Sequence, residues 1–302
     1  MLSGFAIILD NEILYCSNDN KYTHFEIITF VQTLIDSMNR NQTWRLNNII
    51  FKREVPGDES MLIKHVYTQN NQNIFFCIIG DFNAGSRISS ELLEEFTTSI
   101  ENYFVNKEIT QLKTPFERAA FIEHIDYIIL YLIDKYDNLI NGNNNYEKHI
   151  GVSDYSKIIY AGISNQGLPI ISKLYDHDLL QRIGKESNRE NMELFCSDIS
   201  AKLATIAMNT IIRTNSNIEE IQIQDINDDG LDKIILYANI HDFSVDFVAS
   251  GNFSRIKEIF TKFHHQVSSE GIFHEGFNGD LKPYKYLQKF LDDLNNDFDN
   301  EK

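Results

Sequence analysis

Apolar segments alternate with polar turns along the chain. The same order of predicted elements occurs in both halves of the chain. The first apolar run, residues 4–9, is followed after a short turn by residues 13–15, which predicts a β-hairpin. Residues 158–163 and 168–171 predict a matching hairpin in the second half of the chain. Pro169 has no N–H to donate to a neighbouring strand, so we expect its strand at an edge of the sheet.

A helical pattern follows each hairpin. Between Thr23 and Met38, apolar residues return every three or four positions, which predicts an amphipathic helix. In the second half, the capping box Ser187-Asn188-Arg189-Glu190 predicts the start of a longer helix that ends at about Ile212. Three strand-like segments come next in each half: 46–52, 61–67 and 73–79, then 218–223, 233–240 and 243–249.

Two more helices close each half. Ser89 or Ser90 is the expected N-cap of the first of them, and Thr114, followed by proline, predicts the start of the next. Their counterparts are predicted over 253–263 and from about Pro283 onward. The predicted order is therefore ββαβββαα, present twice, in a chain of the α/β (α+β) class.

A polar stretch near the middle separates the two copies. Asn141-Gly142-Asn143-Asn144-Asn145 favours turns and offers nothing to a core. We therefore predict a first domain at 1–140, a linker at 141–156 and a second domain at 157–302.

The charge of the chain narrows the classes of partner. Against 27 Lys and Arg stand 44 Asp and Glu, and the formal net charge is -17. Such a surface repels phosphate backbones and anionic lipid headgroups, so we expect neither nucleic acid nor a membrane surface as a direct partner. A partner protein with a basic patch would be attracted to this acidic surface. The alternative explanation of the negative charge is that it keeps the protein soluble.

The three cysteines and the N-terminus favour a cytoplasmic location. Cys16, Cys77 and Cys196 are far apart, and the last two lie in apolar segments, so we expect buried thiols rather than disulfides or a zinc site. The N-terminus lacks the basic region of a signal peptide. The most apolar helix, 116–140, contains four charged residues in its middle and is not expected to span a bilayer.

No catalytic, cofactor-binding or metal-binding constellation is present in the sequence. The segment from Asp225 to Lys233 resembles a calcium loop, but a lysine occupies its ninth position and Leu236 the twelfth, where a glutamate is needed. A hairpin with an Asp-Gly turn explains the segment better. Histidines are single except His264-His265, and no phosphate-binding loop or nucleophile elbow occurs. We therefore expect a protein that is not an enzyme and needs no cofactor.

The long helix of the second half is apolar on two sides. One side, from Met192 to Ala207, is expected to cover its own sheet, and the opposite side needs another cover. Either the helices of the two repeats contact each other, or a second copy of the protein pairs there; an imperfect pattern covered by the loop at 176–185 is the alternative. The interface residues predicted on these two helices are Phe25, Phe30, Leu194, Ala201, Met208 and Ile212. Tyr127, Leu130 and Tyr131 predict a further covered face on the helix 116–140.

The element order resembles that of the longin domain and of the related roadblock domain. The segment 76–82, followed by 89–96, is similar to the last longin strand running into its next helix. The resemblance covers residues 1–140 and, more weakly, 157–298. It implies that each copy is a five-stranded antiparallel sheet with one helix on one face and two on the other.

The resemblance also implies a function. Longin and roadblock modules commonly pair, and such pairs serve as platforms for small Ras-like GTPases in trafficking and signalling. We therefore expect a non-enzymatic protein-binding scaffold or regulator, with a small GTPase as its partner. The alternatives are a ligand-sensing module of PAS or profilin type and a structural subunit of a coat or tether complex.

Overall fold

The computed structural model describes residues 1–39, 43–52, 58–67, 72–104, 115–142, 155–182, 184, 188–227 and 231–299. The chain divides into two compact units. Unit 1 comprises Met1–Thr29 and Leu46–His149, and unit 2 comprises Phe30–Arg45 and Ile150–Lys302. Most of the predicted linker lies outside the described residues, so the division at 141–156 stays a prediction.

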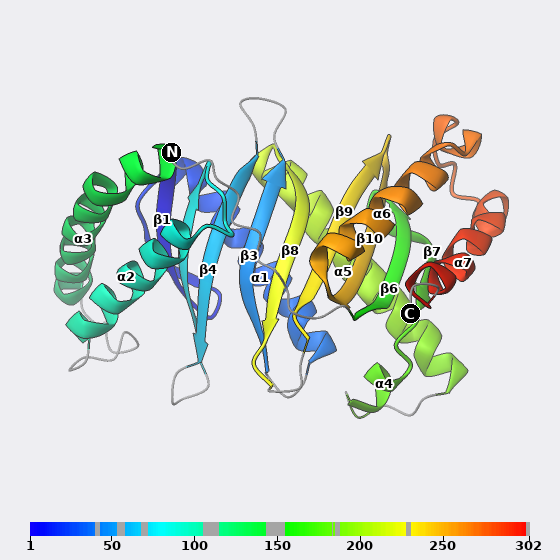
Figure 1. Ribbon diagram of the computed structural model, residues 1–302, viewed down its shortest axis with the longest axis horizontal. Coiled ribbons are helices and arrows are strands. Elements are labelled where there is room, and N and C mark those ends of the chain that lie inside the picture. Colours follow the sequence, from blue (N-terminus) through cyan, green and yellow to red (C-terminus); the bar gives the residue numbers. More distant parts are fainter. Residues whose placement is uncertain are drawn as a thin grey trace. The chain divides into compact units, whose positions relative to one another are not determined.

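Unit 1 is built on an antiparallel sheet with the strand order β2-β1-β5-β4-β3 (Figure 1). Asp10 makes the first turn with a left-handed backbone at φ 53°. The strands are β1 (Leu2–Leu9), β2 (Glu12–Cys16), β3 (Trp44–Lys52), β4 (Glu59–Tyr67) and β5 (Asn73–Gly80). The first two residues of β3, Trp44 and Arg45, belong to unit 2.

Helices cover both faces of this sheet. On one face, alternate strand residues such as Phe5 and Phe76 pack against α2 (Arg87–Phe104) and α3 (Pro115–Gly142). The intervening residues point to the other face, behind which α1 (Tyr22–Met38) begins after a short 3₁₀ turn, η1 (Asp19–Lys21) (Figure 1). The N-cap of α2 is Ser86, whose hydroxyl accepts the N–H of Ser89 at 3.1 Å. The sequence pattern predicts this cap at Ser89 or Ser90, which is one turn too late.

Unit 2 contains the same order of elements. Its antiparallel strands run β8-β9-β10-β6-β7, with the proline-containing strand β7 at an edge as predicted. The turn between β6 and β7 uses positive φ at Gln166 and Gly167. The strands are β6 (Ser156–Asn165), β7 (Leu168–Leu174), β8 (Asn217–Asp225), β9 (Lys233–Ile240) and β10 (Phe243–Gly251).

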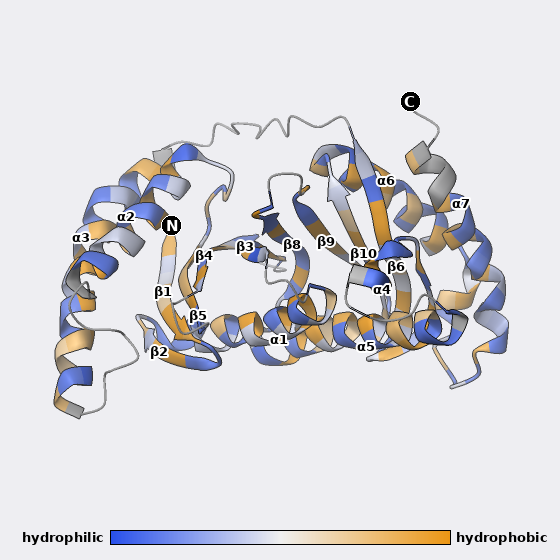
Figure 2. Cartoon of the chain, turned by 90° about the horizontal axis from the view of Figure 1, so that it is seen from below, coloured by the Kyte–Doolittle hydropathy of each residue, from blue (hydrophilic) through white to orange (hydrophobic). Residues whose placement is uncertain are grey.

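One long helix covers one face of this sheet and two helices cover the other. Helix α5 (Arg189–Thr214) packs on β6, β7, β8 and β10, whereas α6 (Phe253–Ser268) and α7 (Gln288–Asp299) share a core with the opposite face (Figures 1 and 2). Asn188 caps α5 by accepting the N–H of Asn191, while Ser187, the predicted cap, lies outside the described residues. Short elements that the sequence did not predict include α4 (Asp178–Arg182) and η3 (Gly271–His274), whereas η4 (Lys282–Leu287) lies where the last helix was predicted to begin.

The structure is thus of the mixed α/β class with antiparallel strands, as predicted. Each strand and each long helix of the predicted order has a counterpart, although the last predicted helix begins as the 3₁₀ turn η4 before α7. Among the described helices, none combines the length and the apolar content that crossing a membrane requires.

Gly251 connects β10 to α6 in a conformation that excludes a side chain. Its φ is 108°, and a Cβ at this position would lie 2.1 Å from the carbonyl oxygen of Tyr155. We expect Gly251→Ala to lower the free energy of unfolding by roughly 1–3 kcal/mol, because both the backbone and the contact are strained. Urea denaturation measures this. Gly167→Ala is the control for the backbone alone, since no atom lies within 4 Å of a Cβ there.

Candidate functional site

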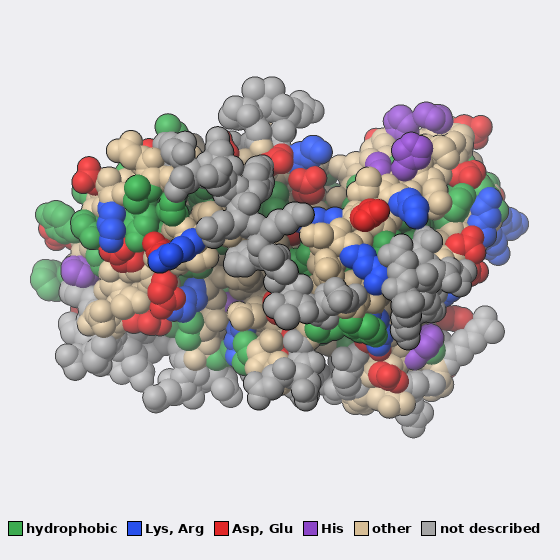
Figure 3. Space-filling view, viewed as in Figure 1, with side chains coloured by type: hydrophobic (Ala, Val, Ile, Leu, Met, Phe, Trp, Pro, Cys, Tyr) green, Lys and Arg blue, Asp and Glu red, His purple; other side chains and the backbone are tan. Residues whose placement is uncertain are grey.

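Helix α3 exposes a row of large apolar side chains. Residues on a helix advance by about 100° each, so Phe116, Tyr127, Leu130 and Tyr131 lie on the side opposite the buried Ile125 and Leu132. Their exposed fractions are 82%, 65%, 64% and 55%, respectively. We call these four residues the α3 face. Figure 3 shows hydrophobic side chains gathered over this helix.

The charge beside the α3 face is negative. The two cationic residues of the helix are already paired, Arg118 with Glu12 at 3.8 Å and Lys135 with Glu95 at 2.6 Å. Within the described part of the chain, no cation pairs with the exposed Glu123 or Asp134. The α3 face therefore combines apolar area with carboxylates that remain available to a basic partner.

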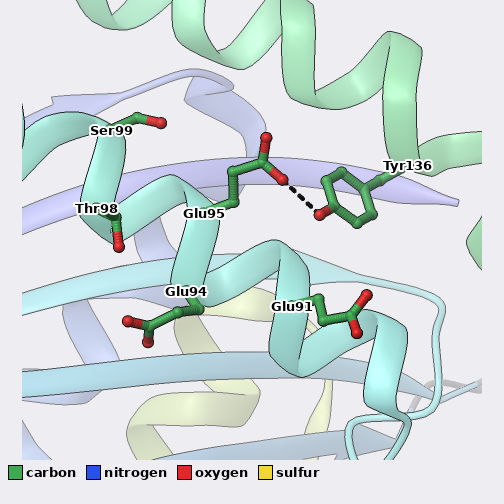
Figure 4. Close-up of a pocket in the computed structure, with 6 residues that line it drawn as sticks. All are labelled: Glu91, Glu94, Glu95, Thr98, Ser99 and Tyr136. Atoms are coloured by element: carbon green, nitrogen blue, oxygen red, sulfur yellow. Dashed lines mark hydrogen bonds between the residues drawn. The ribbon is translucent and has the colours of Figure 1, made fainter.

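A shallow pocket lies between α2 and α3 (Figure 4). Its volume is about 370 Å³, and its lining residues are Glu91, Glu94, Glu95, Thr98, Ser99 and Tyr136. Figure 4 shows the Tyr136 hydroxyl pointing at the Glu95 carboxylate, to which it donates a hydrogen bond of 2.5 Å. Lys135 connects this pair to the α3 face, because its ammonium also lies 5.6 Å from the ring of Tyr131.

The glutamates of the pocket are already neutralised. Burial alone would raise the pKa of Glu95, but hydrogen bonds from Lys135, Tyr136 and Tyr131 outweigh it and lower that pKa. Burial and the bond to Glu95 raise the pKa of Tyr136 to about 12. Glu91 pairs with Arg87 at 2.7 Å, and Glu94 with Lys64 at 2.9 Å. The pocket is therefore no cation site, and Glu95 connects α2 to α3 through its bonds to Lys135 and Tyr136.

Metal-binding geometry is absent from the described residues. They contain no group of three or more His, Cys, Asp or Glu side chains that could hold a metal ion. Residues 228–230, the centre of the calcium-like segment, lie outside the described ranges. Asp225 at its start accepts a short hydrogen bond from the Lys233 ammonium, so this carboxylate is already paired.

A buried polar row crosses the sheet of unit 2 beneath α5. The cross-strand pairs place Ser172, Gly162, Asp246 and Tyr237 side by side on four neighbouring strands. The absence of a side chain at Gly162 makes room for Tyr160, because a Cβ there would lie 2.2 Å from the Tyr160 hydroxyl oxygen. We call these five residues the polar row.

Within the described residues, no cation offsets the charge of the Asp246 carboxyl. It is completely buried, and one oxygen accepts a hydrogen bond of 3.0 Å from Ser244. Burial raises the pKa of Asp246 to about 8, and the bond from Ser244 only partly opposes this rise. Burial, followed by the charge of Asp246, raises the pKa of Tyr160 and Tyr237 as well. Among the described residues, the buried oxygens in or beside the row without a hydrogen-bond partner include Asp246 Oδ2, Tyr237 Oη and Ser164 Oγ.

The fold does not require this polarity. At the matching positions of unit 1, the cross-strand pairs place Cys16, Ala6, Cys77 and Ile63 in one row. The sequence pattern does not single out Asp246, because Ser244 and Asp246 alternate with apolar residues as on a solvated strand face. The apolar inner side of α5 indicates that this face is covered, and that pattern identifies the aspartate as buried.

The predicted interface residues occupy different environments. Phe25 is completely buried, and the ring of Phe30 lies 5.3 Å from the guanidinium of Arg213 at the end of α5. Leu194, Met208 and Ile212 are exposed, and Ala201 is half-buried. The structure thus brings Phe30 to α5 and leaves the outer side of α5 open. Tyr127, Leu130 and Tyr131 all lie on the α3 face.

The sequence matches no protein-family model, and no curated protein is significantly similar to it.

Proposed function

We propose that this protein is a non-enzymatic platform that binds another protein through the α3 face. The observation that carries the proposal is the outward row of Phe116, Tyr127, Leu130 and Tyr131 on a helix whose opposite side already fills the core of unit 1. Aromatic side chains that are exposed together at this density are typical of interaction sites.

The charges beside the face indicate the chemistry of the partner. Glu123 and Asp134 flank the apolar row, and the chain as a whole has a net charge of -17. A partner with an apolar patch surrounded by Lys or Arg gains both contact area and electrostatic attraction. Because screening weakens such attraction, we expect binding to weaken as the salt concentration rises.

A small Ras-like GTPase is the partner class that the resemblance to longin and roadblock modules favours. The order ββαβββαα in both units supports this proposal, since it is the order on which the resemblance rests. In this function two longin-like domains form the platform, and the protein is a regulator or scaffold in trafficking or signalling. A structural subunit of a coat or tether would instead bind a constitutive partner irrespective of nucleotide.

A binding assay with purified Ras-like GTPases from the same genome tests the partner class. Each GTPase is presented nucleotide-free, with GDP and with a GTP analogue. Preference for the nucleotide-free form indicates an exchange factor, and preference for the GTP form indicates an effector or a scaffold for a GTPase-activating protein. The absence of binding in all three states contradicts the GTPase assignment.

Two glutamates on the α3 face should abolish partner binding. We expect Tyr127→Glu with Leu130→Glu to weaken binding at least about tenfold, because both changes bury charge in an apolar contact next to existing carboxylates. Titration by calorimetry measures the loss. Leu168→Glu, at a similarly exposed apolar position on unit 2, is the matched control and should bind normally. Equal affinity of the double variant and the control would refute docking on the α3 face.

A further inference from the structure

The outer side of α5 forms a second exposed apolar surface. Counted at about 100° per residue, Leu194, Ala201, Met208 and Ile212 fall within one narrow strip along the helix. The three large side chains are 62%, 39% and 71% exposed. Figure 2 shows apolar residues recurring along α5. We call this strip the α5 outer face.

This surface is not a consequence of the fold. The inner side of α5 already supplies Phe195, Ile199 and Leu203 to the buried interior of unit 2. Helix α1, which has the same place in the element order, exposes only Tyr22 among its large apolar residues. The apolar outer face therefore belongs to α5 in particular and needs an explanation of its own.

The α5 outer face is electrically neutral and can lose water at little cost. Between Leu194 and Ile212 the only charged residues are Asp198 and Lys202, which pair with each other at 2.5 Å. Two polar side chains on this side donate hydrogen bonds within the helix: Thr205 to the Ala201 carbonyl at 2.7 Å, and Asn209 to the Thr205 carbonyl at 2.9 Å. When this face is buried, Asp198 and Lys202 remain paired with each other. Thr205 and Asn209 keep the hydrogen bonds that they donate within the helix.

We propose that the α5 outer face binds the same face of a second copy of this chain. Two copies with a net charge of -17 repel each other, so they approach best where the surface carries no net charge. A basic partner is instead attracted to the acidic surfaces, such as that around the α3 face. The neutral apolar strip therefore binds best to another neutral apolar surface.

Three of the four residues of the strip also meet small or apolar counterparts in a symmetric pair. In an antiparallel pair related by a two-fold axis that passes between Ala201 and Thr205, Leu194 meets the other copy's Ile212, and Ala201 meets the other copy's Thr205. These two small residues allow the helices to approach closely at the crossing point. A parallel pair would place like ends of the two helix dipoles together, which disfavours it.

A single pair of helices buries less than a standard interface, so we expect a reversible dimer with a dissociation constant in roughly the micromolar range. The affinity of the dimer should respond to salt in the opposite direction from partner binding. Because screening reduces the repulsion between acidic copies, the dimer should strengthen as salt rises, whereas partner binding on the α3 face should weaken.

Sedimentation equilibrium of the full chain over a wide range of concentrations tests the proposal. We expect Met208→Glu with Ile212→Glu to raise the dissociation constant at least about tenfold while the circular dichroism spectrum stays unchanged. Leu130→Glu, at an equally exposed position of the α3 face, should dimerise normally. A wild-type chain that remains monomeric at all concentrations and salt levels, or a dimer lost only in Leu130→Glu, would overturn the proposal. This measurement does not involve GTPase binding. It therefore still tests the dimer if the proposed function fails.

Discussion

Replacing Asp246 with Asn should stabilise unit 2 by several kcal/mol at pH 8 and above. The carboxyl is completely buried, its pKa is raised from the ordinary value of 3.8 to about 8, and no cation among the residues that the structure describes offsets its charge. Each pKa unit corresponds to about 1.4 kcal/mol between the two protonation states. Asn keeps the shape of the side chain and the acceptor for the Ser244 hydroxyl, and it carries no charge that must be buried.

The effect should depend on pH in a defined direction. Below the unfolded pKa the carboxyl is protonated in both states, and the stability associated with this proton is fully present. As pH rises from about 4 towards 8, the unfolded chain releases the proton while the folded chain holds it, so stability falls. Above about 8 the folded state contains a buried carboxylate, and the penalty is complete. The difference between the Asn variant and the wild type should therefore grow with pH and level off near pH 8 to 9.

Urea denaturation between pH 6 and 9 measures this difference. Trp44 is the only tryptophan and lies 4.9 Å from the Lys233 ammonium within unit 2, so its fluorescence reports the unfolding of that unit. Asp242→Asn, at an exposed position next to the same strand, is the control and should leave the pH dependence unchanged. A difference that does not vary with pH would show that Asp246 does not hold its proton in the folded state.

The second large effect is expected at a buried ion pair in unit 1. Lys21 lies 2.7 Å from Glu59, whose side chain is only 3% exposed, and His24 is 3.7 Å from the same carboxylate. Lys21→Met should lower the free energy of unfolding by about 3–5 kcal/mol, because it leaves a buried carboxylate without its cation. Thermal or urea denaturation measures this loss.

Two further variants test whether the loss of stability arises from the burial of the Glu59 charge or from the loss of an ion pair as such. Arg87→Met breaks the exposed pair with Glu91, and we expect it to cost less than about 1 kcal/mol. Adding Glu59→Gln to Lys21→Met removes the orphaned charge and should recover part of the lost stability. If the buried and exposed single variants lose equal stability, desolvation of Glu59 is not the source of the effect.

The strand and helix pattern was predictable because it follows from local periodicity. The apolar run 4–9, the alternating residues of 243–249 and the helical spacing from Thr23 to Met38 all correspond to elements of the structure. Errors occur at helix ends, where Ser86 rather than Ser89 forms the cap, since hydroxyls a turn apart give equivalent local patterns. The α3 face was also visible in the sequence, because Tyr127, Leu130 and Tyr131 break an otherwise charged side of a helix.

The burial of the polar row, and the bonds that join Glu95 on α2 to Lys135 and Tyr136 on α3, could not be predicted from the neighbouring residues in the sequence. Asp246 alternates with apolar neighbours as a solvated residue would, and only the packing of α5 over its strand shows that it is buried. Likewise Glu95 looks like its neighbour Glu94 in sequence, but Lys135 and Tyr136, about 40 residues away, hold it.

By itself, then, the sequence determined which segments form strands and helices and which helix sides are apolar, because these depend on residues within a few positions of one another. The tertiary structure alone decided which polar groups are desolvated and which charges are paired. Those properties depend on side chains that meet only when distant strands and helices pack together, and they set the pKa of Asp246 and the charge left beside the α3 face.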